Sequence, residues 1–209
     1  MNIQLALDRM TIDDAINMAK RVKDHVDWIE VGTSLIKEFG MESVKRMKEA
    51  FPDKTIVADI KTNDNAKYEF ELCFKNGADV ATVMGTAPKA TIQACISVAR
   101  QYQKNVMIDL LNVSQENLEM LSQFDQAILC AHVSKDEQEL SGKSQCLIQL
   151  PSSIIKNNRI AAAGGITIDS MKRLASDSPE VVIIGSAITK AEKPEKVAKE
   201  FKDFIRQLI

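Results

Sequence analysis

The sequence predicts a single α/β domain, a closed (β/α)8 (TIM) barrel formed by residues 1–209. Short apolar runs with strand character recur along the chain, and their starts lie roughly 20–35 residues apart, the length of a strand with its crossover helix. Stretches with helical periodicity separate these runs, and charged side chains gather where several of the runs end. Because strands that alternate with helices form parallel sheets, a barrel and an open doubly wound sheet are the two candidate architectures.

Eight apolar runs are the predicted strands. They lie at residues 3–7, 28–31, 55–58, 80–84, 106–110, 127–131, 160–163 and 181–184. Side chains alternate between the two faces of a strand, so Gln4, Ala6 and Asp8 share one face of the first run. This face becomes polar at its carboxyl end, as expected of a strand that leads to the mouth of a barrel. We therefore favour the barrel over the open sheet.

The connections between the strands carry apolar stripes with helical spacing. The clearest stripes are Ala15, Ile16, Ala19 and Val22, then Ser43, Val44, Met47 and Ala50, and then Ile92, Cys95, Ile96 and Ala99. The weakest predicted helix is the sixth, at residues 143–157, because Pro151 removes a backbone donor and restricts the residue before it.

Composition restricts the class of protein. The net charge is −2 and the apolar fraction is 45%, without a run of like charges. This balance gives no basic footprint for nucleic acid and no polybasic membrane anchor. The four cysteines form no CxxC pair, so we expect reduced thiols rather than disulfides. We also expect no signal peptide and no membrane span, and hence a soluble cytoplasmic protein.

Six ionisable residues lie at or near the ends of predicted strands. They are Asp8, Glu30, Asp59, Lys61, Asp109 and His132. In a barrel these ends converge on the face that holds the active site. Taken singly, Asp8 could cap a helix, and His132 could be a buried histidine with a structural partner. The coincidence of all six indicates a catalytic site.

The residue types indicate the chemistry. Carboxylates from neighbouring strands suit Mg²⁺, which takes oxygen ligands and keeps several waters. A bound Mg²⁺ acts as a Lewis acid that polarises a carbonyl or holds an enediolate. Lys61, beside carboxylates, stays protonated and suits charge stabilisation better than Schiff-base chemistry. His132 can exchange protons near neutral pH. Two histidines far apart in the sequence make a zinc site improbable.

Two glycine turns predict a phosphate site. Gly164 and Gly165 follow the seventh predicted strand, and Gly185 and Ser186 follow the eighth. The loops after these strands form the usual phosphate site of a barrel, where backbone N–H groups approach the anion closely. A Gly-Gly pair alone also serves as a plain turn, but two such turns at these positions indicate a phosphorylated substrate.

Several motifs match a known family in the same order. They are Leu5-Ala6-Leu7-Asp8, Glu30-Val31-Gly32-Thr33, Asp59-x-Lys61-x-x-Asp64, His132, Ala163-Gly164-Gly165-Ile166 and Gly185-Ser186-Ala187-Ile188-Thr189. Over essentially its whole length the sequence resembles the 3-hexulose-6-phosphate synthases. These belong to the orotidine-5′-monophosphate decarboxylase superfamily, with the 3-keto-L-gulonate-6-phosphate decarboxylases as close relatives.

The resemblance implies a homodimeric barrel that binds Mg²⁺ through Glu30 and Asp59. It implies a carbon–carbon lyase that joins formaldehyde to D-ribulose 5-phosphate through a metal-held enediolate. Asp8 and Lys61 would contact the substrate, His132 would move protons, and Asp64 would reach the neighbouring subunit's site. Asp109 would also belong to the catalytic group.

Two alternatives remain within this resemblance. The keto-gulonate decarboxylases typically carry Glu at the position of Asp109 and Arg at that of Ser186, so the synthase activity is favoured over decarboxylation. Residues 62–66 and 133–139 depart from the usual synthase pattern and add polar groups, including Asn65 and Lys135, beside the site. A non-catalytic homologue that binds a sugar phosphate is therefore the second alternative.

Overall fold

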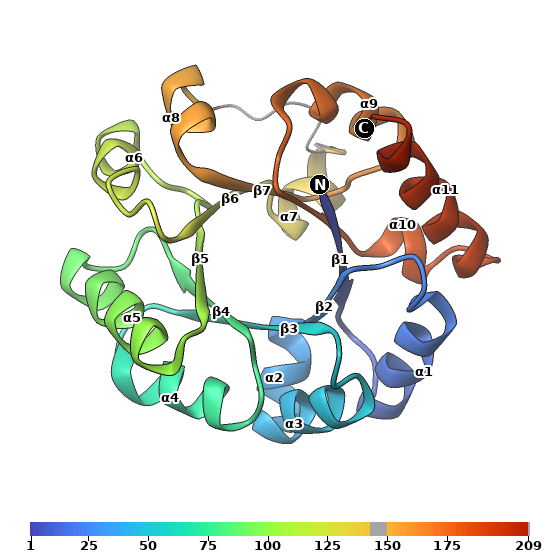
Figure 1. The fold of residues 1–209 in the computed structure, drawn as a ribbon, viewed down its shortest axis with the longest axis horizontal. Helices are drawn as coiled ribbons and strands as arrows, with labels where there is room; N and C mark the ends of the chain where they lie inside the picture. The colour runs from blue at the N-terminus through green and yellow to red at the C-terminus, as the bar shows by residue number, and fades with distance from the viewer. Residues whose placement is uncertain (143–149, 209) are drawn as a thin grey trace.

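The chain forms a closed barrel of parallel strands in the order β1 to β8, which confirms the predicted (β/α)8 architecture (Figure 1). The computed structural model describes residues 1–142 and 150–208. Strand β1 pairs with both β2 and β8, so the sheet has no free edge. The strands are β1 Asn2–Leu7, β2 Trp28–Val31, β3 Thr55–Thr62, β4 Val80–Met84, β5 Asn105–Asp109, β6 Ile128–His132, β7 Arg159–Ala163 and β8 Val181–Ile184.

The helices surround the barrel (Figure 1). They are α1 Ile12–Val22, α2 Thr33–Phe39, α3 Met41–Ala50, α4 Ala66–Lys75, α5 Lys89–Tyr102, α6 Gln115–Leu121, α7 Lys135–Ser141, α8 Ser152–Asn157, α9 Ile168–Leu174, α10 Ser186–Thr189 and α11 Pro194–Arg206, with a 3₁₀ turn at Ala175–Asp177. Only the second half of the helix predicted at residues 143–157 falls among the described residues. Within the described part, α8 begins only after Pro151, and residues 143–149 lie outside the described residues.

Short polar side chains fix where several helices begin. Thr11 precedes α1 and accepts a hydrogen bond from the backbone N–H of Asp14. Ser134 and Glu137 form a reciprocal capping box at the start of α7. Such caps satisfy backbone donors that have no partner inside the helix. The cap of α7 sets the direction in which the chain leaves β6 and passes the mouth of the barrel.

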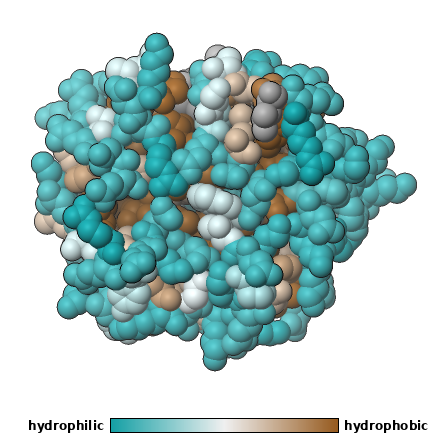
Figure 2. All heavy atoms as spheres, in the orientation of Figure 1, coloured by the Kyte–Doolittle hydropathy of each residue, from teal (hydrophilic) through white to brown (hydrophobic). Residues whose placement is uncertain are grey.

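The apolar core has two parts. The larger part fills the space between the sheet and the helices, and the smaller part fills the inside of the barrel. The interior part is made by Val57, Val80, Met107, Ile128, Cys130, Ala161, Ala163 and Val181. Most side chains on the face seen in Figure 2 are hydrophilic, with apolar atoms visible between them. The barrel interior is thus packed with apolar side chains.

Strand β3 continues beyond its apolar run and includes Asp59 and Lys61. The apolar run suggested an end at Ala58, whereas the strand continues through the charged segment to Thr62. Its register against β4 shifts between Ala58 and Thr62, so a β-bulge lies in the charged segment. Charged residues can remain in the strand because their partners come from the facing strands. The limits of the other strands agree with the prediction to within one residue at each end, a difference that is ordinary for element ends.

Within the described residues, no helix is both long enough and apolar enough to cross a membrane.

Candidate active site

A cavity of about 880 Å³ opens at the carboxyl ends of the barrel strands. The first turns of the following connections also contribute to its wall. The structure brings together here ten of the residues predicted from the sequence: Asp8, Glu30, Asp59, Lys61, Asp109, His132, Gly164, Gly165, Gly185 and Ser186. The roles assigned to these residues remain predictions, and their geometry shows what each can do.

Lys61 lies between two carboxylates. Its Nζ is 3.0 Å from Asp59 Oδ1 and 2.8 Å from Asp109 Oδ2. Burial disfavours the ammonium, but the charges of Asp59 and Asp109 outweigh burial and raise the pKa of Lys61 above its ordinary value. Lys61 is therefore a permanent cation in a partly buried cavity, where a fixed charge acts more strongly on a substrate than it does in water.

Asp109 connects Lys61 with His132. The Nδ1 atom of His132 lies 2.9 Å from Asp109 Oδ2 and 3.1 Å from Oδ1. Burial opposes ionisation of Asp109, but the hydrogen bond and charge of His132, together with Lys61, lower its pKa below the ordinary value. An ionised Asp109 accepts a hydrogen bond from the Nδ1–H of His132, so the Nε2 edge of the ring is the one that can exchange protons with a substrate.

Glu30 is buried at 6% exposure on the floor of the cavity. Burial, followed by the negative charges of Asp59 and Asp8, raises the pKa of Glu30 well above its ordinary value. The side chain of Gln4 donates a hydrogen bond from Nε2 to Glu30 Oε2. The other Gln4 side-chain atom, Oε1, is buried and has no hydrogen-bond partner among the described residues.

These donors fit a bound Mg²⁺. A divalent cation between Glu30 and Asp59 would neutralise the carboxylate repulsion, and its waters would give Gln4 Oε1 a donor. Mg²⁺ is commonly held by one or two carboxylates, with water and substrate oxygens as further ligands. Within the described ranges, no three His, Cys, Asp or Glu side chains are grouped closely enough to hold a metal by themselves. The donor set therefore suits Mg²⁺ better than a closed all-protein site.

Asp8 is held by the first turn of α2. Its Oδ1 accepts hydrogen bonds from the backbone N–H of Ser34 at 3.0 Å and from the Ser34 hydroxyl at 2.6 Å. A Cβ atom added to Gly32 would lie 2.3 Å from the Asp8 carboxyl carbon. The exposed Asp8 carboxylate therefore occupies the space that a side chain at position 32 would need. It lies at the rim where a substrate enters.

The predicted phosphate loops both line the cavity. Gly164 and Gly165 have positive φ angles of 109° and 65°, which L side chains rarely adopt. A Cβ on Gly164 would lie 2.4 Å from the Val133 carbonyl oxygen. Gly185 directly precedes α10, whose first backbone N–H groups lack intrahelical partners. The two turns therefore present backbone donors to the same cavity.

Asp64 lies apart from this group. It is exposed, its Oδ1 accepts a hydrogen bond from the backbone N–H of Asn65, and it does not line the cavity of its own chain. The sequence motif places Asp64 near Lys61, but the strand ends before it. The structure thus places Asp64 outside the cavity that holds the other predicted site residues.

The sequence reasoning missed the residues that hold the site groups in place. The Thr33 hydroxyl lies 2.7 Å from Asp59 Oδ2, and the Thr82 hydroxyl donates to Asp59 Oδ1 at 2.9 Å. The sequence pattern places Gln4 on the same strand face as Asp8 but assigns it no role in the site. Thr82 gives no such signal, because threonine is an ordinary strand residue.

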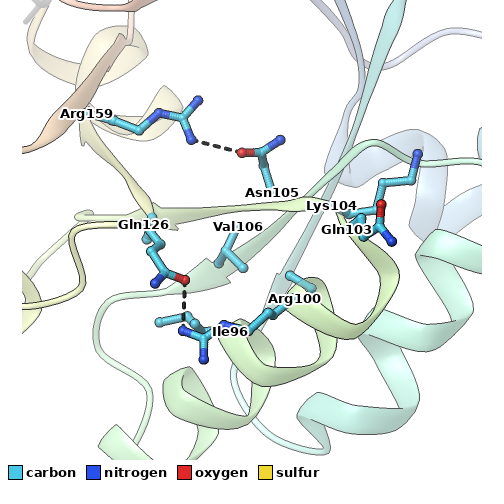
Figure 3. A pocket seen from close by; sticks show the side chains of 10 residues that line it. Ile96, Arg100, Gln103, Lys104, Asn105, Val106, Gln126 and Arg159 are labelled. Carbon is cyan, nitrogen blue, oxygen red and sulfur yellow. Dashed lines mark hydrogen bonds between the residues drawn. The ribbon is translucent and has the colours of Figure 1, made fainter.

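A second, smaller hollow of about 390 Å³ lies near the amino ends of β5 and β7. Figure 3 shows its two side-chain hydrogen bonds, from Arg159 to Asn105 and from Arg100 to Gln126. Two of its cations are already neutralised, since Arg159 pairs with Glu180 and Lys104 pairs with Asp79. The contacts of this hollow tie secondary-structure elements together, and the catalytic group lies at the opposite end of the barrel.

Three comparisons with known proteins, by family model, by sequence and by structure, agree with one another. The model of the orotidine 5′-phosphate decarboxylase / HUMPS family matches residues 1–201. A 3-hexulose-6-phosphate synthase from Staphylococcus aureus is 34% identical over 202 residues, which cover 96% of each protein. The crystal structure of 3-hexulose-6-phosphate synthase from Salmonella typhimurium has a TM-score of 0.93 and 36% identity, covering 100% of both chains. The crystal structure of 3-keto-L-gulonate-6-phosphate decarboxylase from Vibrio cholerae has a TM-score of 0.83 and 27% identity, covering 100% of this chain and 98% of that chain.

The family match and the first two relatives agree with the resemblance indicated by the motifs. The relatives match the chain nearly end to end, and their fold is the barrel described above. The chain belongs to the orotidine 5′-phosphate decarboxylase / HUMPS family.

Proposed function

We propose that this protein is a Mg²⁺-dependent aldehyde-lyase that condenses formaldehyde with D-ribulose 5-phosphate to give 3-hexulose 6-phosphate. The observation that carries the proposal is the connected group of Lys61, Asp109 and His132 beside the carboxylates of Glu30 and Asp59. Two 3-hexulose-6-phosphate synthases, 34% and 36% identical to this chain, support the choice of reaction.

The reaction needs a proton acceptor next to a stabilised negative charge. His132 takes a proton from C1 of the sugar phosphate, and the electron pair of that C–H bond forms the new bond to the formaldehyde carbon. The formaldehyde oxygen then receives the proton, so the addition releases no other product. Asp109 keeps the His132 ring oriented, and the ammonium of Lys61 stabilises the negative charge that develops on the substrate oxygens.

Glu30 and Asp59 are the residues that would hold Mg²⁺. When bound, the metal supplies Lewis-acid stabilisation of negative charge on the substrate oxygens. The backbone donors of the Gly164–Gly165 and Gly185–Ser186 turns bind the phosphate, and Asp8 contacts the sugar at the rim of the cavity. Holding the phosphate at one side of the mouth orients C1 toward His132, which lowers the entropic part of the barrier.

We place the catalytic unit in a homodimer with its sites at the interface. Asp64 supports this proposal because it is exposed and lies outside its own cavity, in the connection that follows β3. A cytoplasmic location belongs to the same proposal. It is supported by the buried free thiols of Cys73, Cys95 and Cys130, which fit a reducing compartment.

Decarboxylation of 3-keto-L-gulonate 6-phosphate is the second candidate. The decarboxylase from Vibrio cholerae shares the fold over nearly the whole chain at 27% identity. Loss of CO₂ also leaves negative charge next to a carbonyl, and Lys61, together with a cation held by Glu30 and Asp59, would stabilise it equally well. The proton from His132 would then go to carbon instead of being removed from it.

To test this, the purified protein is incubated with formaldehyde, ribulose 5-phosphate and Mg²⁺, and the loss of formaldehyde is measured over time. We expect formaldehyde loss that requires both the sugar phosphate and the metal and that stops in excess chelator. The matched control is Asp59→Asn, which keeps the side-chain shape but removes the charge from a predicted ligand.

The other outcomes identify the alternatives. Loss that persists in chelator contradicts the metal requirement. CO₂ release from 3-keto-L-gulonate 6-phosphate without formaldehyde consumption establishes the decarboxylase instead. Binding of ribulose 5-phosphate with neither product formed identifies a non-catalytic sugar-phosphate-binding homologue.

A further inference from the structure

Thr82 is a buried residue of β4 whose hydroxyl joins two groups of the active site. It is 3% exposed. Its Oγ1 accepts a hydrogen bond from the backbone N–H of Lys61 at 2.8 Å and donates one to Asp59 Oδ1 at 2.9 Å. One side-chain atom therefore contacts the backbone of the fixed cation and the carboxylate of a predicted metal ligand.

The Lys61 backbone needs such a contact because its conformation is unfavourable. Its φ angle is 52°, in the left-handed region that residues with a side chain rarely adopt. The register between β3 and β4 shifts at this segment. The N–H of Lys61 therefore donates its hydrogen bond to a side chain of β4. Strained backbone of this kind persists only where its surroundings hold it in place.

Only a hydroxyl can fill this position among side chains of this size. It donates one hydrogen bond and accepts others, whereas the methyl groups of valine do neither. The Asp59 carboxylate has another tether, because the Thr33 hydroxyl contacts its Oδ2 at 2.7 Å. Thr33 approaches from the side of β2, and its hydroxyl bonds to the carboxylate and the carbonyl of Asp59. Thr82 is the residue that couples Asp59 to the Lys61 backbone.

We propose that Thr82 is a positioning residue: its hydroxyl fixes the Asp59 carboxylate and the left-handed backbone at Lys61 relative to each other. This inference rests on the proposed function for its catalytic consequence. Its structural consequence, the linked placement of Asp59 and Lys61, does not depend on the substrate. Thr82 acts through these two residues and is not itself assigned a contact with substrate.

The proposal predicts a defect in metal binding and turnover when the hydroxyl is removed. In Thr82→Val the Lys61 N–H loses its acceptor and Asp59 loses a donor, while the side-chain shape is kept. We expect Mg²⁺ affinity and kcat each to fall by about 10- to 100-fold, the usual effect of residues that orient metal ligands. KM for the sugar phosphate should change little, because the turns that we expect to bind the phosphate follow β7 and β8, whereas Thr82 lies on β4. Thr82→Ser should recover most of both losses.

Two readouts besides activity test the positioning itself. Titration calorimetry with Mg²⁺ alone measures the metal affinity of each variant. Amide hydrogen exchange at Lys61, followed by NMR, measures the hydrogen bond to Thr82 and should be faster by about tenfold or more in Thr82→Val. The matched control is Ser43→Ala, which removes a fully buried hydroxyl that bonds to the Gly40 carbonyl in the α2–α3 turn. It should lower stability without changing Mg²⁺ affinity or kcat.

The outcomes separate this inference from the proposed function. If the wild type fails to condense formaldehyde but Thr82→Val still weakens Mg²⁺ binding, the reaction assignment fails and the positioning role stands. If Thr82→Val keeps wild-type Mg²⁺ affinity and kcat, the positioning role is overturned. Equal defects in Thr82→Ser and Thr82→Val also overturn it, because the hydroxyl would then be irrelevant. If Thr82→Val does not fold, Thr82→Ser and Thr82→Ala provide the same comparison, since they differ by one oxygen.

Discussion

Asp109 is the residue that connects Lys61 with His132, the two side chains to which we assign charge stabilisation and proton transfer. One of its oxygens, Oδ2, contacts both the ammonium of Lys61 and Nδ1 of His132. Because its pKa is lowered despite burial, it stays ionised through the range in which histidine titrates. A single carboxylate thus keeps the cation in place and orients the proton-transfer group, which a neutral residue of the same size could not do.

Gly32 shows how a residue without a side chain can determine a catalytic geometry. Its φ of −68° and ψ of 162° are open to any residue, so no special backbone conformation requires glycine here. Its requirement is spatial, since an added Cβ would lie within 2.3 Å of Asp8 atoms. The position is therefore sensitive to substitution only because Asp8 occupies the space.

We predict that Gly32→Ala destabilises the protein by about 1–3 kcal/mol, the usual cost of overpacking. The methyl group would displace the Asp8 carboxylate from its hydrogen bonds with Ser34. Urea unfolding measures the change. In the double variant Gly32→Ala/Asp8→Ala the clash is gone, and most of the loss caused by Gly32→Ala should disappear. If the two substitutions destabilise additively, the spatial explanation is wrong.

At the scale of elements, Asp79 ties three parts of the barrel together just before β4. Its carboxylate accepts hydrogen bonds from the backbone N–H of Ile56 in β3, from Lys48 Nζ in α3 and from Lys104 Nζ before β5. Burial opposes ionisation of Asp79, but the hydrogen bonds from Lys104, Ile56 and Lys48 prevail and lower its pKa. This contact fixes the amino ends of the strands whose carboxyl ends carry the site.

We predict that Asp79→Asn lowers the free energy of unfolding by about 1–3 kcal/mol at pH 7, because two ammonium groups lose a charged partner. The wild-type carboxylate has a lower pKa when folded than when unfolded, where it is about 3.9. Its stabilisation is therefore present above about pH 4 and is lost as the pH falls through the folded pKa. Urea unfolding at pH 7 and in acid should show the difference between the two proteins shrink below about pH 4. A difference that stays constant with pH would refute the charged tie.

At the scale of the whole molecule, the barrel brings side chains from distant parts of the chain to one mouth. The cavity receives groups from β1 at one end of the chain and from the turn after β8 at the other. Asp64 is the predicted site residue that this arrangement leaves outside. A complete site with Asp64 then requires two chains, and a two-fold dimer would supply each site with the partner's residue.

Mixed dimers test this arrangement. Asp64→Ala and Lys61→Ala should each be nearly inactive alone. When equal amounts are unfolded and refolded together, half of the dimers are mixed and each has one intact site, so about one quarter of wild-type activity should return. Refolding each variant separately before mixing provides the control. If no activity returns, the two residues act within one chain or Asp64 has no catalytic role.

The sequence alone determined the barrel and most of its mouth. Strand alternation and helical periodicity are local properties, so the position of Asp8, Glu30, Asp59, Asp109 and His132 at strand ends could be predicted from neighbouring residues. The number and spacing of these units left an open sheet as the alternative, and the polar carboxyl end of one strand face favoured the closed barrel, which the structure confirms. The two glycine turns could be found in the same way. Glycine turns after both of the last two strands are unusual unless they bind a phosphate, so they predict a phosphate site.

Only the tertiary structure decided how these residues are held. The bulge in β3 and the left-handed backbone at Lys61 depend on pairing with β4, which local sequence does not report. The role of Thr82 arises from contacts with residues more than twenty positions away. A side chain at position 32 is excluded because Asp8, just past the end of β1, occupies the space beside it. Such contacts join separate strands, and they form only when the closed barrel brings those strands together.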